Sequence, residues 1–204
     1  RDFSVSRGQA LLTENTALYQ NIEEALKDAG LIDVCSRYIG YQTKLIDINP
    51  QINDETDGFW HKVFSDTSLS IPKTAYFHRD VSGGDLKLIL YLNDVSLENG
   101  PFSFVLGTHK ICYPKWAAWA AKANDQSGLS GCDIYNRRCF AALPKIFQKK
   151  ASFGNDLQDG SDISTKLLQS EWKITAPQGS MILFDPKGIH RGGMVTKGER
   201  MVLT

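Results

Sequence analysis

The segment 86–94, LKLILYLND, constrains the fold most strongly, because its strand pattern is largely apolar on both faces. Alternate residues of a strand point to opposite sides, so Lys87, Ile89 and Tyr91 share one face and a row of leucines occupies the other. A strand that is apolar on both sides is normally covered on both sides in the folded protein. We therefore predict that this segment is a central strand of a sheet, or a strand that helices cover.

Further strand patterns surround this segment, and helical patterns precede it. Apolar residues recur with a period of 3.6 residues over 15–29, which predicts a helix whose buried stripe includes Leu18 and Leu26 and which stops at Gly30. A second helix is predicted over 32–38, and residues 51–72 read as a loop with a short structured turn. Strands are predicted at 41–49 (ending at Pro50), 73–79, 101–106, 172–176, 180–185, 189–195 and 200–204. This order predicts a mainly β fold, a sandwich or barrel with flanking helices on one side.

Composition narrows the class of protein. The chain has 204 residues, enough for one domain with a substantial core, and its net charge is zero, which gives no reason to expect nucleic acid or membrane as a partner. The four cysteines form no CxxC pair, which favours reduced thiols in a cytoplasmic protein. The chain begins at Arg1 and ends inside an apparent strand, so we expect further residues beyond both ends.

A histidine and a carboxylate two residues apart give the first chemical signal. His78 and Asp80 occur in YFHRD, at the end of a predicted strand, where both side chains would point to the same side. Two histidines and one carboxylate on one face of a metal leave three positions open, which suits non-haem Fe(II). The candidates for the second histidine are His61, His109 and His190. His190, on a predicted strand in FDPKGIHRGG, is preferred, whereas the other two fit surface histidines.

An arginine follows ten residues after His190. Arg200 occurs in KGERMVLT, where a turn at Lys197 and Gly198 would fold its strand back beside the strand of His190. A guanidinium can hold a carboxylate through two parallel hydrogen bonds. Arg200 is therefore a candidate to bind a dicarboxylate co-substrate.

Taken in order, these motifs resemble the phytanoyl-CoA dioxygenase-like family of Fe(II)/2-oxoglutarate-dependent oxygenases. The resemblance rests on HRD, on LKLILYLNDVSLENGPFSFVLGTHK and on HRGG with its later arginine, and it covers about 30–110 and 172–204. It implies a double-stranded β-helix (a jelly-roll, cupin-like fold) and makes His78, Asp80 and His190 the metal ligands and catalytic residues. It also implies that Arg200 holds the distal carboxylate of 2-oxoglutarate. Many relatives carry a Ser or Thr two residues after the distal histidine as a helper, but this chain has Gly192 there.

The expected enzyme is a single jelly-roll oxygenase domain over 1–204, with N-terminal helices within 13–40 and a lid-like insertion at 111–170. It would use Fe(II), 2-oxoglutarate and dioxygen to hydroxylate a small-molecule substrate, leaving succinate. Lys87 and Tyr91 are further candidates to contact 2-oxoglutarate if their face points inward, and Thr74 and Tyr76 are candidates to line the substrate pocket. Arg191 should point away from the metal and have a structural role.

A basic cluster in the insertion is either a solvated face or a feature that attracts an anionic substrate; its members are Arg137, Arg138, Lys145, Lys149 and Lys150. Two alternatives remain: a non-catalytic jelly-roll binding protein, and a metal-dependent cupin enzyme that does not use 2-oxoglutarate.

Overall fold

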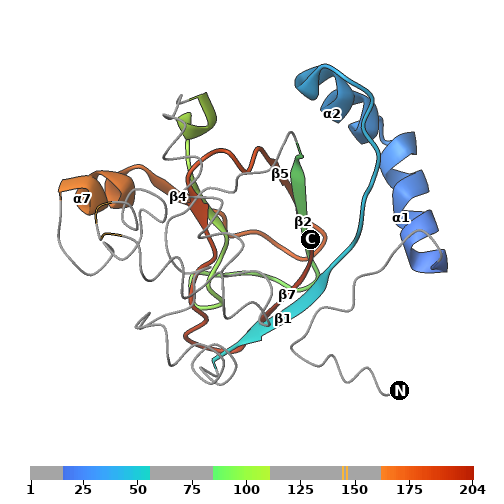
Figure 1. Cartoon of the computed structure of the whole chain (residues 1–204). Helices are drawn as coiled ribbons and strands as arrows, with labels where there is room; N and C mark the ends of the chain where they lie inside the picture. The colour runs from blue at the N-terminus through green and yellow to red at the C-terminus, as the bar shows by residue number, and fades with distance from the viewer. Residues whose placement is uncertain (1–15, 56–84, 111–143, 145, 147–161) are drawn as a thin grey trace.

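The protein is mainly β, with antiparallel sheets and few helices (Figure 1). The computed structural model describes residues 16–55, 85–110, 144, 146 and 162–204. Within these ranges the strands form two sheets, and no helix there is long and apolar enough to cross a membrane.

The larger sheet has four strands. They are β1 (Pro50–Asp54), β7 (Glu199–Leu203), β2 (Lys87–Tyr91) and β5 (Met181–Phe184), side by side in the order β1-β7-β2-β5. All its pairs are antiparallel, and β2 is an inner strand, as its two apolar faces predict.

The smaller sheet has three strands. They are β4 (Glu171–Lys173), β3 (Ser103–Val105) and β6 (His190–Arg191), in the order β4-β3-β6. Phe104 is paired with Trp172 on one side and with His190 on the other. Every residue of β3 is buried, which fits its central place in this sheet.

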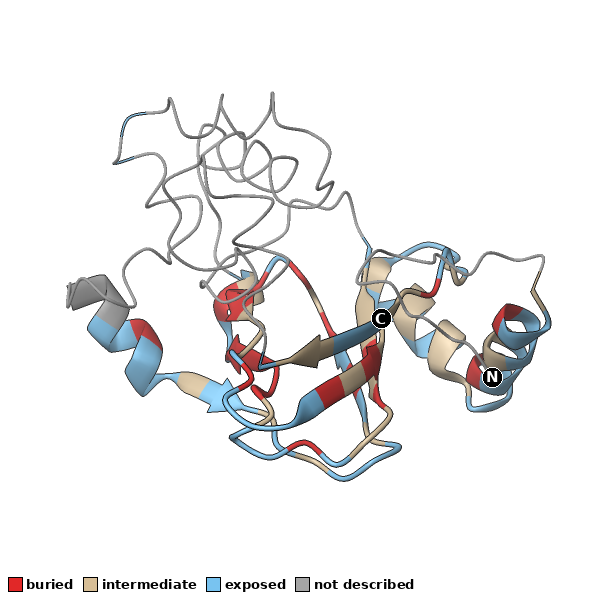
Figure 2. Ribbon diagram, turned by 90° about the horizontal axis from the view of Figure 1, so that it is seen from below, coloured by how far each residue is buried: buried red, intermediate tan, exposed pale blue. Residues whose placement is uncertain are grey.

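The main hydrophobic core joins the two sheets. Its buried members come from both of them and from the segments beside them: Ile89, Tyr91, Val95, Phe102, Phe104, Ile182, Phe184 and Val202. The face of β2 that carries Lys87, Ile89 and Tyr91 is the one turned toward this core, because Ile89 and Tyr91 belong to it. In Figure 2 the buried residues, coloured red, gather on the strands near the middle of the described part.

The helices near the N-terminus are where the sequence predicts them. They are α1 (Ala17–Asp28), which Thr16 caps by accepting a hydrogen bond from Tyr19 N, and α2 (Leu31–Ile39), which lies between Gly30 and Gly40 in left-handed conformations. The predicted stripe of α1 is partly wrong. Leu18 is 49% exposed, and Tyr19 and Leu26 are buried instead. Tyr19 turns inward because its hydroxyl donates to Leu45 O at 2.6 Å, a contact that hydrophobic periodicity cannot reveal.

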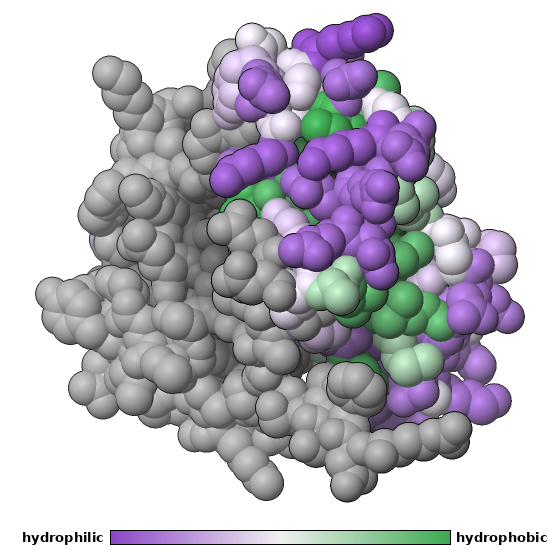
Figure 3. Space-filling model, turned by 90° about the vertical axis from the view of Figure 1, so that its right-hand side faces the viewer, coloured by the Kyte–Doolittle hydropathy of each residue, from purple (hydrophilic) through white to green (hydrophobic). Residues whose placement is uncertain are grey.

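The helices leave apolar groups exposed to solvent. No residue of α2 is buried, and Val34, Tyr38 and Tyr41 are each more than half exposed. Figure 3 views the side of the molecule that carries α1 and α2, where green apolar groups interrupt a mostly polar surface. Two short helical segments complete the description: η3 (Thr108–Lys110) and α7 (Asp162–Gln169).

The predicted strand at 41–49 is wrong. In that segment only Ile48 forms an isolated bridge, and the strand β1 runs instead over Pro50–Asp54, inside the predicted loop 51–72. Proline can begin a strand at a sheet edge because its missing N–H costs no ladder hydrogen bond there. β1 is an edge strand of the larger sheet, so Pro50 starts it rather than ending a preceding one.

Candidate metal and co-substrate site

His190 lies in the core between the two sheets. It is 4% exposed, and its ring centroid lies 5.1 Å from that of Phe184 and 5.7 Å from that of Phe102. The ring of Phe104 stacks nearly parallel to it at 6.5 Å. Three aromatic rings therefore fix the plane of the imidazole and exclude water from it.

The backbone fixes the tautomer of His190. Its Nδ1 lies 2.9 Å from the carbonyl oxygen of Gly188, and because a carbonyl only accepts, Nδ1 must carry the hydrogen. In the neutral ring the lone pair is then on Nε2. Histidines that bind metals commonly have this arrangement: one ring N–H donates to a backbone carbonyl, and the other nitrogen holds a lone pair.

The turn before His190 is held by a buried threonine. The hydroxyl of Thr108 donates to Val105 O at 2.6 Å and accepts from Ile189 N at 2.8 Å. Gly188 in the same turn passes so close to the ring of Phe104 that a Cβ there would overlap it. The position of His190 thus depends on the G-T-H-K segment and on a glycine in its own turn.

Arg200 is a buried cation. It is 9% exposed on β7, on the same face as Val202 of the core, and its guanidinium donates to Gly193 O at 3.4 Å. No carboxylate in the described ranges forms an ion pair with it. Burial lowers the pKa of Arg200, an effect that the nearby Tyr91 partly opposes. Even so, a guanidinium stays charged at neutral pH, so the core holds a positive charge beside the segment that follows His190.

Two asparagines hold the loop that joins His190 to Arg200. The side chain of Asn93 accepts from Met201 N at 2.8 Å and donates to Glu199 O at 2.9 Å, so it binds the backbone on both sides of Arg200. The side chain of Asn99 donates to Lys197 O and Glu199 O, each at 3.2 Å. The L-N-D-V and E-N-G-P motifs therefore set where β7 returns after His190.

Gly100 allows its own loop to pack directly against the loop that follows His190. Gly100 has a φ of +64°, and a Cβ built on it would lie 2.6 Å from Gly193 O and from backbone atoms of Met194. The two backbones touch here, and Gly193 N donates to Pro101 O at 3.1 Å.

Lys87 and Tyr91 share one face of β2, as predicted, and this face is the inward one, which the sequence left open. Lys87 is half-buried and is paired across the sheet with Phe184. Tyr91 is fully buried, donates to Ile174 O at 3.0 Å and accepts from Phe102 N at 3.1 Å. Burial raises the pKa of Tyr91, although the Phe102 N–H and the charge of Arg200 act against the rise. The one hydroxyl hydrogen of Tyr91 is thus used within the core.

Arg191 has the structural role that strand alternation predicts. Its guanidinium makes two hydrogen bonds of 2.6 Å to the carboxylate of Glu171, which also accepts from Ser103 Oγ at 2.5 Å. Glu171 is on β4 and Ser103 on β3, so the contact spans the small sheet and ties β6 to the far strand.

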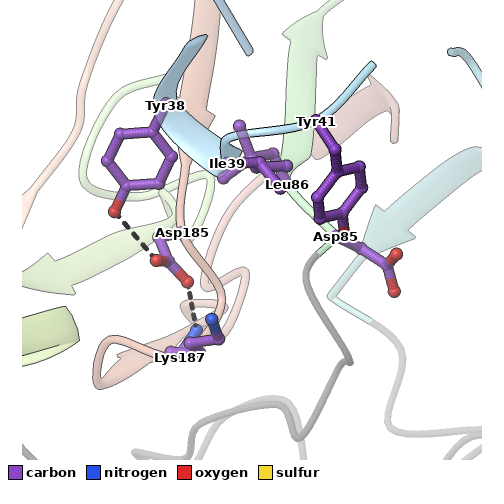
Figure 4. A pocket seen from close by; sticks show the side chains of 7 residues that line it. All are labelled: Tyr38, Ile39, Tyr41, Asp85, Leu86, Asp185 and Lys187. Atoms are coloured by element: carbon purple, nitrogen blue, oxygen red, sulfur yellow. Dashed lines mark hydrogen bonds between the residues drawn. The ribbon is translucent and has the colours of Figure 1, made fainter. Parts of the chain in front are cut away.

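A polar surface pocket lies beyond the ends of β2 and β5. Its volume is about 320 Å³, and it is lined by Tyr38, Ile39, Tyr41, Asp85, Leu86, Asp185 and Lys187 (Figure 4). Tyr38 donates to Asp185 at 2.9 Å, which connects α2 to the turn before His190. Burial and the Asp185 carboxylate both raise the pKa of Tyr38.

Several predicted site residues lie outside the described residues: His78, Asp80, Thr74, Tyr76 and the alternative ligand His61. Within the described ranges, no three histidine, cysteine or acidic side chains gather as a metal site would require. His109, the other alternative, lies partly buried in η3. Of the predicted site, the structure therefore places His190, Arg200, Lys87 and Tyr91, and it turns all four toward the interior.

Sequence reasoning missed the side chains that support the site. Thr108, Asn93 and Asn99 occur in motifs that carried the resemblance, but no role was assigned to any of them. The available signal was chemical: a short amide or hydroxyl side chain at the end of a strand commonly binds nearby backbone.

No family model matches the chain, and no curated protein matches it. Solved structures do resemble it. HygX from Streptomyces hygroscopicus, with nickel and 2-oxoglutarate bound, is 14% identical over 96% of this chain and 68% of HygX, with a TM-score of 0.49. SnoK, a non-haem alpha-ketoglutarate-dependent carbocyclase from nogalamycin biosynthesis, is 12% identical over 98% of this chain and 79% of SnoK, with a TM-score of 0.45. AviO1 from Streptomyces viridochromogenes Tue57 is 13% identical with a TM-score of 0.42; the match covers 85% of this chain but only 54% of AviO1. Likeness at this level does not transfer an activity, so the function rests on this chain's own residues.

Proposed function

We propose that the protein is an Fe(II)/2-oxoglutarate-dependent dioxygenase that hydroxylates a small molecule. The observation that carries the proposal is the pairing of His190 with Arg200. One is a buried imidazole with its lone pair on Nε2, and the other is a buried guanidinium without a carboxylate partner among the described residues. One loop joins them, and Asn93 and Asn99 hold its end through hydrogen bonds. The guanidinium of Arg200 donates to Gly193 O, three residues after His190.

The order of strands supports a jelly roll. β3 pairs with β4, β2 with β5 outside them, and β1 with β7 outside those, so the chain folds as nested antiparallel pairs. β6 lies between β5 and β7 in sequence, and its partner in this nesting would come from between β1 and β2, in 55–86. Two four-stranded antiparallel sheets built from such pairs make a jelly roll. His78 and Asp80 fall in that interval, which supports placing them beside His190.

On this proposal His78, Asp80 and His190 are the metal ligands. His190 fits that role because Gly188 O orients its ring and three aromatic rings hold it dry. Two imidazoles and one carboxylate leave open positions for a 2-oxo acid and dioxygen. Thr108 supports His190 from behind through Ile189 N.

Arg200 would bind the distal carboxylate of 2-oxoglutarate. A buried guanidinium needs an anion more than an exposed one does, because water no longer solvates it. Tyr91 would pack near Arg200 but would not donate to the ligand, since its hydroxyl hydrogen is donated to Ile174 O. Lys87, on the same face of β2, would contribute a positive charge that attracts a carboxylate toward the space between the sheets.

The ferrous ion with dioxygen would supply the oxidation, in which 2-oxoglutarate becomes succinate and carbon dioxide while the substrate gains a hydroxyl group. The protein's own part is to orient and to exclude water. Arg200 fixes one end of the co-substrate, and the rings of Phe102, Phe104 and Phe184 keep the region around His190 apolar.

Substrate recognition is proposed for segments around this centre. Thr74 and Tyr76 would lie on the same side of their strand as His78 and line the pocket. The basic cluster of the insertion 111–170 would favour an anionic substrate. The whole chain would then act as one oxygenase domain.

The test is anaerobic addition of Fe(II) and 2-oxoglutarate to the protein. We expect a weak visible absorption band from the chelate, lost in His190→Ala and in His78→Ala, with succinate formed once oxygen is admitted. In Arg200→Met the band should require about ten- to hundredfold more 2-oxoglutarate, because a charge-assisted hydrogen-bonded pair is lost. Bound iron without a band in the unaltered protein would contradict the proposal and favour a cupin enzyme that needs no 2-oxo acid.

A further inference from the structure

β1 places an asparagine directly opposite Arg200. The register of the large sheet pairs Asn53 with Arg200, and directly opposed residues of an antiparallel pair point to the same face. Arg200 and Val202 are buried on that face, and Asn53 is half-buried on the same face at the edge strand. Their Cβ atoms are expected to lie about 5 Å apart.

The amide of Asn53 is left with an unused donor. Its Nδ2 is buried and has no hydrogen-bond partner among the described residues. Buried donors are rarely left unsatisfied, and one without a protein acceptor is a candidate to bind a ligand. Here the unused N–H group belongs to the residue that lies opposite Arg200 in the sheet, and both this N–H group and the guanidinium can only donate.

Two neighbouring donors, one of them charged, form a site for an anion with two oxygens. We infer that Asn53 Nδ2 and Arg200 together bind the distal carboxylate of 2-oxoglutarate, Asn53 donating to one oxygen and Arg200 to the other. The inference rests on the proposed function and extends it to a residue of β1. Gly192, in the loop after His190, has no side chain with which to provide such a donor.

Other asparagines near this site do not share this property. Asn93 uses both ends of its amide on the backbone around Arg200. Asn49 also has a buried amide atom that no group in the described part of the chain contacts through a hydrogen bond, but that atom is the oxygen Oδ1, which would repel a carboxylate. Asn49 precedes Asn53 by four residues, which is about 13 Å along a strand, so it serves as a matched control.

The experiment compares two ligands on three proteins. Binding of 2-oxoglutarate and of 2-oxopentanoate, which has the same length but no distal carboxylate, is measured by calorimetry with Mn(II) in the absence of oxygen. We expect Asn53→Ala to bind 2-oxoglutarate about ten- to hundredfold more weakly than the unaltered chain, because a hydrogen bond to a charged group is lost. Its affinity for 2-oxopentanoate should be unchanged, and Asn49→Ala should bind both ligands as the unaltered chain does.

Asn53→Asp gives a sharper version of the same test. It keeps the size of the side chain but places a carboxylate against Arg200, where it would compete with the ligand. Binding of 2-oxoglutarate should fall further than in Asn53→Ala, while the thermal midpoint without ligand stays level or rises from the new ion pair.

The outcomes separate this inference from the proposed function. If the unaltered chain binds no 2-oxoglutarate, both are overturned. If it binds and Asn53→Ala binds equally well, or if the variant weakens both ligands alike, the inference alone fails. A purely structural asparagine would instead lower the thermal midpoint without ligand, whereas loss of an unsatisfied donor should not.

Discussion

At the scale of single residues, the site depends on side chains that satisfy backbone groups in the core. Thr108 is the clearest case, because one hydroxyl serves both Val105 O and Ile189 N next to His190. The hydroxyl does not touch the proposed metal, so its effect on chemistry must pass through the position of the imidazole. Thr108 is in this sense a positioning residue.

Thr108→Val should lower the free energy of unfolding by about 1–3 kcal/mol, because the buried Ile189 N–H loses its acceptor. The same change should weaken metal binding, since the turn that aims His190 loosens. Thr108→Ser keeps the hydroxyl and should restore most of the metal affinity. Urea unfolding and titration with Mn(II) measure the two effects. If Thr108→Val and Thr108→Ser bind metal equally well, the hydroxyl has no positioning role.

Tyr91 gives a prediction in alkali. Burial raises its pKa above that of a tyrosine in the unfolded chain, so the folded state holds the phenolic proton more tightly. Its contribution is therefore complete below about pH 10 and is lost as the pH rises through the folded-state pKa. Tyr91→Phe should be less stable near neutral pH, since Phe102 N–H and Ile174 C=O lose their partner. It should also lose less stability between neutral pH and strong alkali than the unaltered chain. Parallel loss in both proteins, measured by urea unfolding across that pH range, would show that Tyr91 does not contribute.

At the scale of elements, sequence alone predicted those parts of the fold that periodicity controls. The two-sided apolar pattern of 86–94 identified β2 as an inner strand, and alternation placed Lys87, Ile89 and Tyr91 on one face, but which face points inward is known only from the structure. Hydrophobic periodicity did not predict which residue is buried where a single polar contact determines it. Tyr19 replaced Leu18 in the buried stripe of α1 because its hydroxyl found a carbonyl far along the chain.

The start of β1 and the supporting contacts had no local signal. Pro50 looked like the end of a strand because proline usually stops one, and only its place at a sheet edge makes it a beginning. Asn53 was likewise assigned to a loop, and its relation to Arg200 appears only once the register is known. The pairing of distant strands is what sequence patterns in one chain do not contain.

The contact between the loop 96–101 and the loop after β6 can be tested with two glycines. Gly100→Ala must place a Cβ against Gly193 and Met194 at a positive φ, so we expect a loss of at least about 2 kcal/mol in the free energy of unfolding. Gly179 also has a positive φ, +85°, but open space around it. Gly179→Ala should cost only about 1 kcal/mol, the strain of the left-handed conformation. Equal losses in urea unfolding would show that the close contact of the two backbones contributes nothing.

At the scale of the whole molecule, the site lies where the two sheets face each other. His190 belongs to the small sheet and Arg200 to the large one, and the core between them is shared. A ligand held by both residues would therefore link the sheets, so that binding and global stability become coupled. No carboxylate in the described ranges pairs with Arg200, and a buried charge without an anion lowers the free energy of unfolding.

Ligand addition should therefore raise the unfolding temperature in two separable steps. At concentrations about a hundred times the dissociation constant, each ligand adds about 2.7 kcal/mol, which corresponds to about 5–10 °C for a domain of this size. We expect Mn(II) to give the first rise and 2-oxoglutarate the second. His190→Ala should abolish the first rise and with it most of the second.

Arg200→Met separates the two steps. It removes the buried charge and keeps an apolar side chain of similar length, so without ligands it should be as stable as the unaltered chain or more stable. It should keep the rise with Mn(II) and lose the rise with 2-oxoglutarate, and calorimetric scans with and without a chelator measure both. A buried cation kept for ligand binding should lower the free energy of unfolding when its anion is absent. If Arg200→Met is instead less stable than the unaltered chain without ligands, and its unfolding temperature still rises with 2-oxoglutarate, then Arg200 stabilises the fold and does not bind the co-substrate.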